Sequence, residues 1–104
     1  MKLIKNLNQL KSGAFYKENG NYYKFTGVNS FGQYEAISFC LDEMEEKYLD
    51  LETPWFDVVV KDQGVEEISE KEFLNAFKKF HKLKKAELKI ERETLKIAKE
   101  KLLK

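Results

Sequence analysis

An uninterrupted helical pattern at the C-terminal end of the chain is the feature that most constrains its fold. Ser69 and Glu72 have the spacing of a capping box, while Ile68 and Phe73 occupy the positions of a hydrophobic staple. Neither Gly nor Pro occurs after Ser69, so the pattern predicts a single helix over residues 69–104, about 52 Å long at 1.5 Å per residue. A helix of that length exceeds the expected width of a small β core, and we expect it to pack proximally and to project distally.

The apolar residues of this helix change their arrangement about halfway along it. Proximal residues form one stripe at about 100° per residue, as in a helix packed on a sheet: Phe73, Ala76, Phe77 and Phe80. Distal residues form two narrow seams, which we interpret as a surface for other helices or for a partner. A solvated helix with incidental aliphatic residues is the alternative, and a break near His81 would give two shorter helices. The candidate interface residues are Leu83, Leu88, Ile90, Leu95, Ile97 and Leu102.

Residues 1–68 predict a small antiparallel sheet. Asn19-Gly20 stands between two runs of strand-forming residues and indicates a two-residue type I′ hairpin. That turn fixes the register, so that Tyr16 lies opposite Tyr23 on the face that we expect to form the core.

Three further strands complete the expected sheet. After a turn at Asn29-Ser30-Phe31-Gly32, a third strand follows over Tyr34–Leu41, with its odd-numbered residues facing inward. The acidic residues 42–52 are interpreted as a solvated connection, after which Trp55–Lys61 is predicted to form a fourth strand and Val65–Ile68 a fifth. The prediction is one α+β domain, in which a small antiparallel β-barrel or curled sheet of four or five strands precedes the long C-terminal helix.

Composition and motifs argue against catalysis and against disulfide formation. Cys40 and His81 are the only residues of their kinds, so we expect no intramolecular disulfide, no four-ligand zinc site and no complete catalytic set. The common nucleotide-binding, hydrolase and metalloprotease motifs do not occur. The sequence shows no leader-like segment and no membrane-spanning apolar run. We expect a non-catalytic, cytoplasmic protein without a cofactor or a metal.

Charge is distributed unevenly along the chain. Residues 1–68 carry seven Lys and twelve acidic residues, a net charge of −5, whereas residues 69–104 carry twelve basic and six acidic residues, a net charge of +6. We interpret the main acidic run as a candidate site for a partner protein, because a string of carboxylates imitates a phosphate backbone. A charged loop that only favours solubility is the alternative. The residues of this site are Asp42, Glu43, Glu45, Glu46, Tyr48, Asp50 and Glu52.

A second candidate surface lies on the other face of the predicted hairpin. Aromatic rings alternate there with positive charge, the arrangement in which bases stack while phosphates are neutralised. Together with the Lys-rich helix, this face predicts RNA or single-stranded DNA binding as a rival function. Ordinary cross-strand pairing with a cation–π contribution is the alternative. The residues are Phe15, Lys17, Tyr22 and Lys24.

The stretch from Gly13 to Phe39, GAFYKENGNYYKFTGVNSFGQYEAISF, resembles the opening hairpins of small SH3-like barrels. The chain is also similar in style to small phage proteins that pair such a barrel with a helix, including anti-CRISPR and other anti-defence inhibitors. The resemblance implies an inhibitor that acts through protein contacts on a nucleic-acid-handling complex, and it carries no site residues. We therefore expect a protein-interaction module first, a direct nucleic-acid binder second, and a scaffold that self-associates through the distal helix third.

Overall fold

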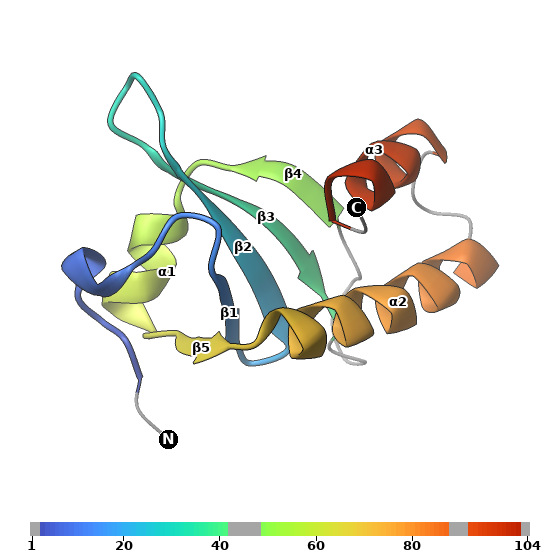
Figure 1. The fold of residues 1–104 in the computed structure, drawn as a ribbon, viewed down its shortest axis with the longest axis horizontal. Coiled ribbons are helices and arrows are strands. Elements are labelled where there is room, and N and C mark those ends of the chain that lie inside the picture. The colour runs from blue at the N-terminus through green and yellow to red at the C-terminus, as the bar shows by residue number, and fades with distance from the viewer. Residues whose placement is uncertain (1–2, 42–48, 88–91, 103–104) are drawn as a thin grey trace.

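The computed structural model describes residues 3–41, 49–87 and 92–102, with helical side chains described as far as Lys82 and again from Lys96. The chain is an α+β structure built from one sheet and several helices (Figure 1). No helix in the described part is long and apolar enough to cross a membrane. The elements, in chain order, are the 3₁₀ turn η1 (Leu7–Gln9), strands β1 (Phe15–Glu18), β2 (Asn21–Val28), β3 (Tyr34–Cys40) and β4 (Leu49–Thr53), helix α1 (Phe56–Asp62), strand β5 (Glu66–Ile68), and helices α2 (Glu70–Glu87) and α3 (Arg92–Leu102).

The five strands form one antiparallel sheet in the order β4-β3-β2-β1-β5. The end strands β4 and β5 do not pair with each other in the described part of the chain, so the sheet is open and is not a closed barrel. The β1–β2 hairpin confirms its prediction, because Asn19 and Gly20 take φ values of 46° and 84°, as a type I′ turn requires. Tyr16 lies opposite Tyr23, in the predicted register.

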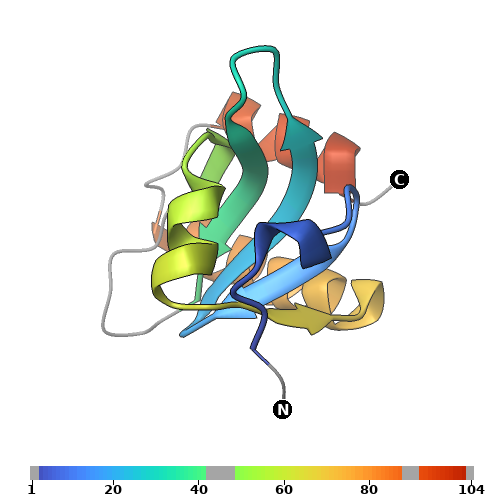
Figure 2. The same cartoon turned by 90° about the vertical axis from the view of Figure 1, so that its left-hand side faces the viewer.

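Helices cover both faces of this sheet. Seen from the side, η1 and α1 lie in front of the sheet, and α2 and α3 lie behind it (Figure 2). Strand β3 is consequently buried at every position from Ala36 to Cys40, where the sequence predicted alternation. The core under α2 and α3 contains Ile37, Phe39, Ile68, Phe73, Ala76, Phe77, Phe80, Ala98 and Leu102. The core under α1 contains Tyr16, Tyr23, Phe25, Ala36, Phe56, Val59, Val60 and Val65.

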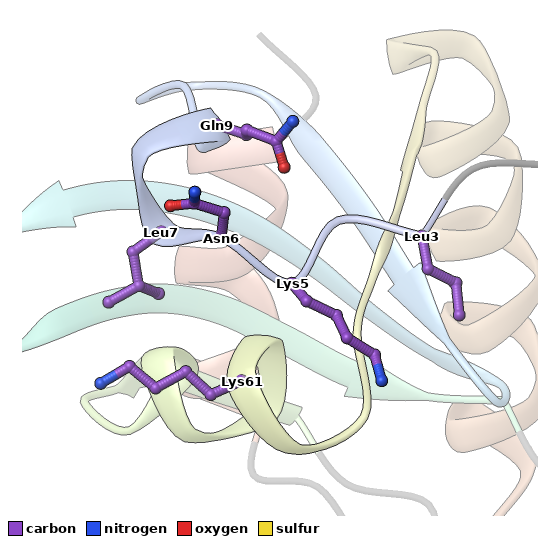
Figure 3. Close-up of a pocket in the computed structure, with 6 residues that line it drawn as sticks. All are labelled: Leu3, Lys5, Asn6, Leu7, Gln9 and Lys61. Carbon is purple, nitrogen blue, oxygen red and sulfur yellow. The ribbon is translucent and has the colours of Figure 1, made fainter.

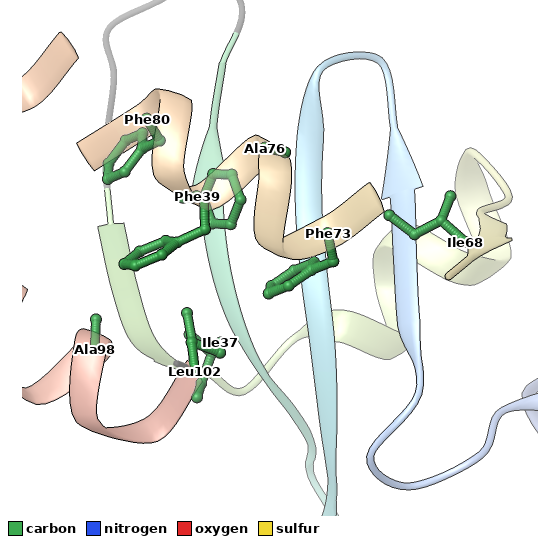
Figure 4. Packing of buried hydrophobic residues seen from close by; sticks show 9 residues of the cluster. Ile37, Phe39, Ile68, Phe73, Ala76, Phe80, Ala98 and Leu102 are labelled. Atoms are coloured by element: carbon green, nitrogen blue, oxygen red, sulfur yellow. The ribbon is translucent and has the colours of Figure 1, made fainter. Parts of the chain in front are cut away.

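Phe39 lies at the centre of the core under α2. Its ring centroid is 5.3 Å from that of Phe73, 5.6 Å from that of Phe77 and 5.1 Å from that of Phe80. The predicted apolar stripe of the helix therefore packs on the middle of the sheet (Figure 4). Aromatic contacts of this kind add about 0.5–1.5 kcal/mol each to the free energy gained by burial.

Phe56 organises the core on the other face, where its ring packs on aromatic residues of β1 and β2 with centroids 5.0–5.9 Å apart. Phe56 is the first residue of helix α1, so the prediction of a fourth strand over Trp55–Lys61 is wrong. The β-branched run suggested a strand, but burial follows helical spacing. Val59 and Val60 are buried together with Phe56, whereas Val58 is 49 % exposed.

The fourth strand lies instead in the acidic segment that was predicted to be a solvated connection. Its described part, Leu49–Thr53, pairs with β3, and Leu49 and Leu51 pack against the core under α2. The hydroxyls of Thr53 and Ser38 are both buried and lie 2.7 Å apart, so each satisfies the other. The high acidic content of the segment concealed the alternation of apolar residues in this strand.

Two helices replace the single C-terminal helix that was predicted. Helix α2 begins as expected, since the Glu72 amide donates to Ser69 Oγ at 3.1 Å, but it ends at Glu87 and a separate helix α3 follows. Helix α3 contacts β4, and its residues Ala98 and Leu102 are buried in the core under α2 (Figure 4). Folding back in this way removes apolar surface from water that a projecting helix would leave exposed.

Candidate functional site

The β2–β3 hairpin extends beyond the helical layers. A bulge at Thr26 interrupts its pairing, and Gly27 has a φ of 130°, which residues with side chains rarely adopt. Beyond the bulge the strands continue as far as the pair formed by Val28 and Tyr34. The tip of the hairpin stands clear of α1 and of the other helices (Figure 1, Figure 2).

A hydrogen-bonded turn holds this tip in one shape. The side-chain Oδ1 of Asn29 accepts from the amides of Phe31 at 2.8 Å and Gln33 at 3.0 Å, and its Nδ2 donates to Gln33 Oε1 at 2.8 Å. The main chain adds bonds from Asn29 N to Gln33 O at 2.9 Å and from Gly32 N to Asn29 O at 3.0 Å. Gly32 has a φ of 79°, in the left-handed region that favours glycine. These bonds fix the backbone that carries Phe31.

Phe31 is presented to solvent at the tip. It is 87 % exposed, and Val28, at the last strand position before the turn, is 53 % exposed. Residues 26–34 contain no charged side chain, although 36 % of the residues in the chain are charged. An exposed segment that lacks charge and surrounds an aromatic anchor with Asn, Ser, Gly and Gln has the composition of a protein-binding loop.

The start of α1 adds two exposed apolar residues next to the first residue of β3, at the end of the strand pair that leads into the turn. Trp55 forms a β-bridge with Tyr34, and the Val58 amide donates to the Trp55 carbonyl at 3.0 Å. Tyr34 stacks on Phe25, with ring centroids 5.8 Å apart, and so connects the start of β3 to the core under α1. We call the following four exposed residues the hairpin surface: Val28, Phe31, Trp55 and Val58.

The predicted acidic site lies mostly outside the described residues. Its two described members, Asp50 and Glu52, lie in the edge strand β4, where Asp50 is half-buried and Glu52 is exposed. Asp50 Oδ1 accepts from the Glu52 amide at 3.0 Å, so part of this carboxylate is engaged within its own strand. The role of the run as a binding site stays a prediction. The members outside the described part are Asp42, Glu43, Glu45, Glu46 and Tyr48.

The predicted nucleic-acid face of the first hairpin lies under α2. Phe15 packs on Phe73 with ring centroids 4.7 Å apart, and Tyr22 stacks on Phe39 at 5.3 Å. Lys24 Nζ lies 5.7 Å from the ring centroid of Phe15, within the range of a cation–π contact. Each of the two rings, Phe15 and Tyr22, therefore has another ring packed against it and is partly buried in the core under α2, and the role of this face in nucleic-acid binding stays a prediction.

Lys17, the fourth residue of that face, connects β1 to the start of α2. Its Nζ donates to Glu72 Oε2 at 2.9 Å and lies 3.8 Å from Glu66 Oε1. The hydrogen bond to Glu72 raises the pKa of Lys17 above its ordinary value. The ammonium group is therefore engaged within the protein, and so is the carboxylate of Glu72.

Two residues of the predicted helix interface have described side chains, and one lies in the core while the other faces solvent. Leu102 is only 6 % exposed and packs in the core under α2, so it is not available to a partner, whereas Ile97 on the same helix is 40 % exposed. The remaining predicted side chains lie outside the described part of the chain: Leu83, Leu88, Ile90 and Leu95.

Cys40 and His81 were weighed as a catalytic pair. Cys40 is buried in β3. His81 is half-buried on α2. Among the described residues, no group of three or more His, Cys, Asp or Glu side chains is placed to hold a metal ion. The absence of catalysis stays a prediction.

An open pocket lies between the N-terminal segment and α1 (Figure 3). The amine ends of Lys5 and Lys61 point in different directions and do not converge on a common point (Figure 3). Small-molecule sites usually close around a few convergent polar groups, so this pocket is a poor candidate for a ligand site. Its lining residues are Leu3, Lys5, Asn6, Leu7, Gln9 and Lys61.

Sequence reasoning did not assign the hairpin surface. The segment around Phe31 was predicted only as a turn, and Trp55 and Val58 were placed in a strand. The signal that was present is the uncharged stretch of residues 26–34, which is unusual for exposed positions in so highly charged a chain.

Comparisons of the chain with protein-family models, with curated proteins and with solved structures gave no match in any of the three. The interpretation of the hairpin surface therefore rests on its own geometry and chemistry.

Proposed function

We propose that this protein acts by binding another protein through the hairpin surface. The observation that carries the proposal is Phe31, which is almost fully exposed at the tip of a turn fixed by the side chain of Asn29. Leaving a Phe in water forgoes about 1.5–3 kcal/mol of burial free energy. A rigid aromatic side chain loses little conformational entropy on binding, and such residues supply much of the free energy of protein interfaces.

Other exposed residues of the hairpin and of the start of α1 support the same function. Val28 and Trp55 enlarge the apolar area, while the exposed residues Ser30 and Gln33 provide an uncharged polar rim. An apolar centre within a polar rim is the usual anatomy of a protein interface. Because the hairpin projects beyond the helices, it fits a recess in its partner.

A narrower form of this proposal is an inhibitor of a nucleic-acid-handling complex, such as a CRISPR complex. It requires the acidic run to take part in the contact. Reversing two of its charges with Glu45→Lys and Glu46→Lys would abolish partner binding if the run contributes. Unchanged binding would leave the hairpin surface as the contact and would remove the reason to propose imitation of a phosphate backbone.

The proposal is tested by affinity capture from the cells that produce the protein, with and without nuclease, followed by mass spectrometry. We expect the parent protein to retain a protein partner after nuclease treatment and Phe31→Ser to retain about tenfold less, the loss typical of a central interface residue. Leu3→Ser is the matched control, because Leu3 is an exposed apolar residue beside the β1–β2 turn, at the opposite end of β2. Equal capture by Phe31→Ser and the parent would contradict the proposal, as would recovery that disappears with nuclease.

A further inference from the structure

Helix α2 carries a row of lysines on the face that is turned away from the sheet. At about 100° per residue, Lys71, Lys78 and Lys82 fall within about 40° of one another, on the side opposite the buried Phe stripe. Lys79 lies next to this row, and all four lysines are exposed. At 1.5 Å per residue, the row extends over about 16 Å of the helix axis.

Among the residues that the structure describes, little negative charge offsets the row. Between Lys71 and Lys82 the sequence contains one acidic residue, Glu72, and its carboxylate accepts from Lys17 Nζ at 2.9 Å. The ion pairs in the described part of the chain are made by Lys11 and Lys17, and none involves the row. Glu70 lies before the row, at the start of the helix. Within the described part of the chain, the structure thus sets apart a cluster of four positive charges that the sequence showed only as part of a mixed helix.

We infer that this lysine face, Lys71, Lys78, Lys79 and Lys82, binds the phosphate backbone of double-helical nucleic acid without reading its base sequence. Lysine is a compact charge that suits phosphate, and it lacks the planar fork with which Arg reads the edge of a base. The length of the row, about 16 Å, corresponds to the axial rise of about five phosphates on one strand. A straight helix can therefore bring several ammonium groups within reach of phosphates over this length of the duplex.

Two other anionic partners fit this face less well. Single strands are usually held on exposed aromatic rings, and the aromatic residues of α2 in the described part, Phe73, Phe77 and Phe80, are all buried. Helices that bind membrane surfaces insert apolar residues beside their lysines. The exposed large apolar residues of the described part lie on other elements, and Asn75 is the exposed residue between Lys71 and Lys78 that lies on this face.

The lysine face and the hairpin surface are separate sites. The tip of the hairpin and α2 lie on different sides of the molecule (Figure 1), so a duplex on α2 leaves Phe31 free. This inference therefore does not depend on the proposed function, and either can fail without the other.

Fluorescence anisotropy with a short labelled DNA duplex, measured over a salt series, tests the inference. With four phosphate contacts we expect log K to fall with log[salt] with a slope of about −3 to −4, which is roughly a 100-fold loss of affinity between 50 and 200 mM salt. The triple variant Lys71→Gln, Lys78→Gln, Lys82→Gln should bind at least about tenfold more weakly at low salt, with a slope near about −1. The control variant Lys5→Gln, Lys11→Gln, Lys61→Gln has the same net charge and should keep the slope of the parent within about 0.5.

Several results would overturn the inference. Equal weakening by the two triple variants would show that net charge, rather than the lysine face, determines binding. Equal or tighter binding of a single strand of the same length, of polyglutamate or of anionic vesicles would assign the lysine face to a different partner. If the duplex does not bind at low salt, the inference is wrong. Urea unfolding of both variants establishes that neither set of substitutions acts by disrupting the fold.

Discussion

The base and the tip of the β2–β3 hairpin use phenylalanine in opposite ways. Phe39, near the base, is fully buried and is surrounded by three aromatic rings of α2, whereas Phe31, at the tip, is almost fully exposed. The two residues belong to one pair of strands and have the same intrinsic preference. The burial of Phe39 is explained by its contribution to the stability of the fold, whereas the exposure of Phe31 contributes nothing to stability. This difference is why we place the contact with a partner at the tip.

The largest expected effect is the loss of folding stability when Phe39, but not Phe31, is substituted. Phe39→Ala should lower the free energy of unfolding by about 3–5 kcal/mol, the usual cost of removing a buried aromatic side chain. Phe31→Ser should change it by less than about 0.5 kcal/mol, because an exposed side chain contributes little to folding. Urea unfolding followed by circular dichroism measures both. If Phe39→Ala does not fold, Phe39→Leu should still lose about 1 kcal/mol, and similar losses at positions 31 and 39 would contradict the comparison.

A second pair of variants tests whether the end of α3 packs in the core under α2. Leu102→Ala should lower the free energy of unfolding by about 2 kcal/mol, because Leu102 packs in the core under α2. Ile97→Ala, on the same helix, is the control and should cost less than about 0.5 kcal/mol, because Ile97 is exposed. The same urea titration measures these losses. A projecting helix would instead give two small and equal effects.

The conformation of the tip depends on the hydrogen bonds of the Asn29 side chain. Asn29→Ala removes the side-chain hydrogen bonds to Phe31 and Gln33 and should lower stability by about 1 kcal/mol. It should also weaken partner capture, although Phe31 is still present, because the aromatic ring is no longer held in place. Ser30→Ala, in the same turn, is the control. If Asn29→Ala captures the partner as well as the parent does, preorganisation of the turn is unimportant.

The smallest expected effect concerns the buried phenol of Tyr16. Burial raises the pKa of Tyr16 above its ordinary value, and its Oη accepts from the Lys11 amide at 2.9 Å. A raised pKa means that the folded state favours the protonated phenol, so this contribution is present below about pH 10 and is lost as the pH rises through the pKa of the folded state. Tyr16→Phe should cost about 0.5–1 kcal/mol at neutral pH and should reduce the fall in stability above about pH 10. An unchanged alkaline profile would show that Tyr16 is not the group responsible.

Local signals predicted the parts of this fold that neighbouring residues determine. The Asn19-Gly20 turn, the cap at Ser69 and the Phe stripe of α2 were all predicted and are all present. The errors fall where burial against distant residues decides the structure. The run from Val58 to Val60 has strand propensity but forms a helix because its spacing fits the core around Phe56.

The candidate site was less predictable than the fold. The exposure of Phe31 depends on where the helices stop covering the sheet, which is a property of the whole molecule. In the same way, the sequence did not show that α2 packs on the hairpin face that carries Phe15 and Tyr22. The uncharged stretch of residues 26–34 was the one local signal that pointed to the hairpin surface.

Photo-cross-linking from position 31 in the cells that produce the protein tests most directly whether the tip is the contact. A photoreactive phenylalanine derivative replaces Phe31 in one variant and Leu3, at the opposite end of β2, in the other. We expect position 31 to give a discrete protein adduct that survives nuclease and that position 3 does not give. The absence of an adduct from position 31, or the same adducts from both positions, would contradict the assignment of the hairpin surface.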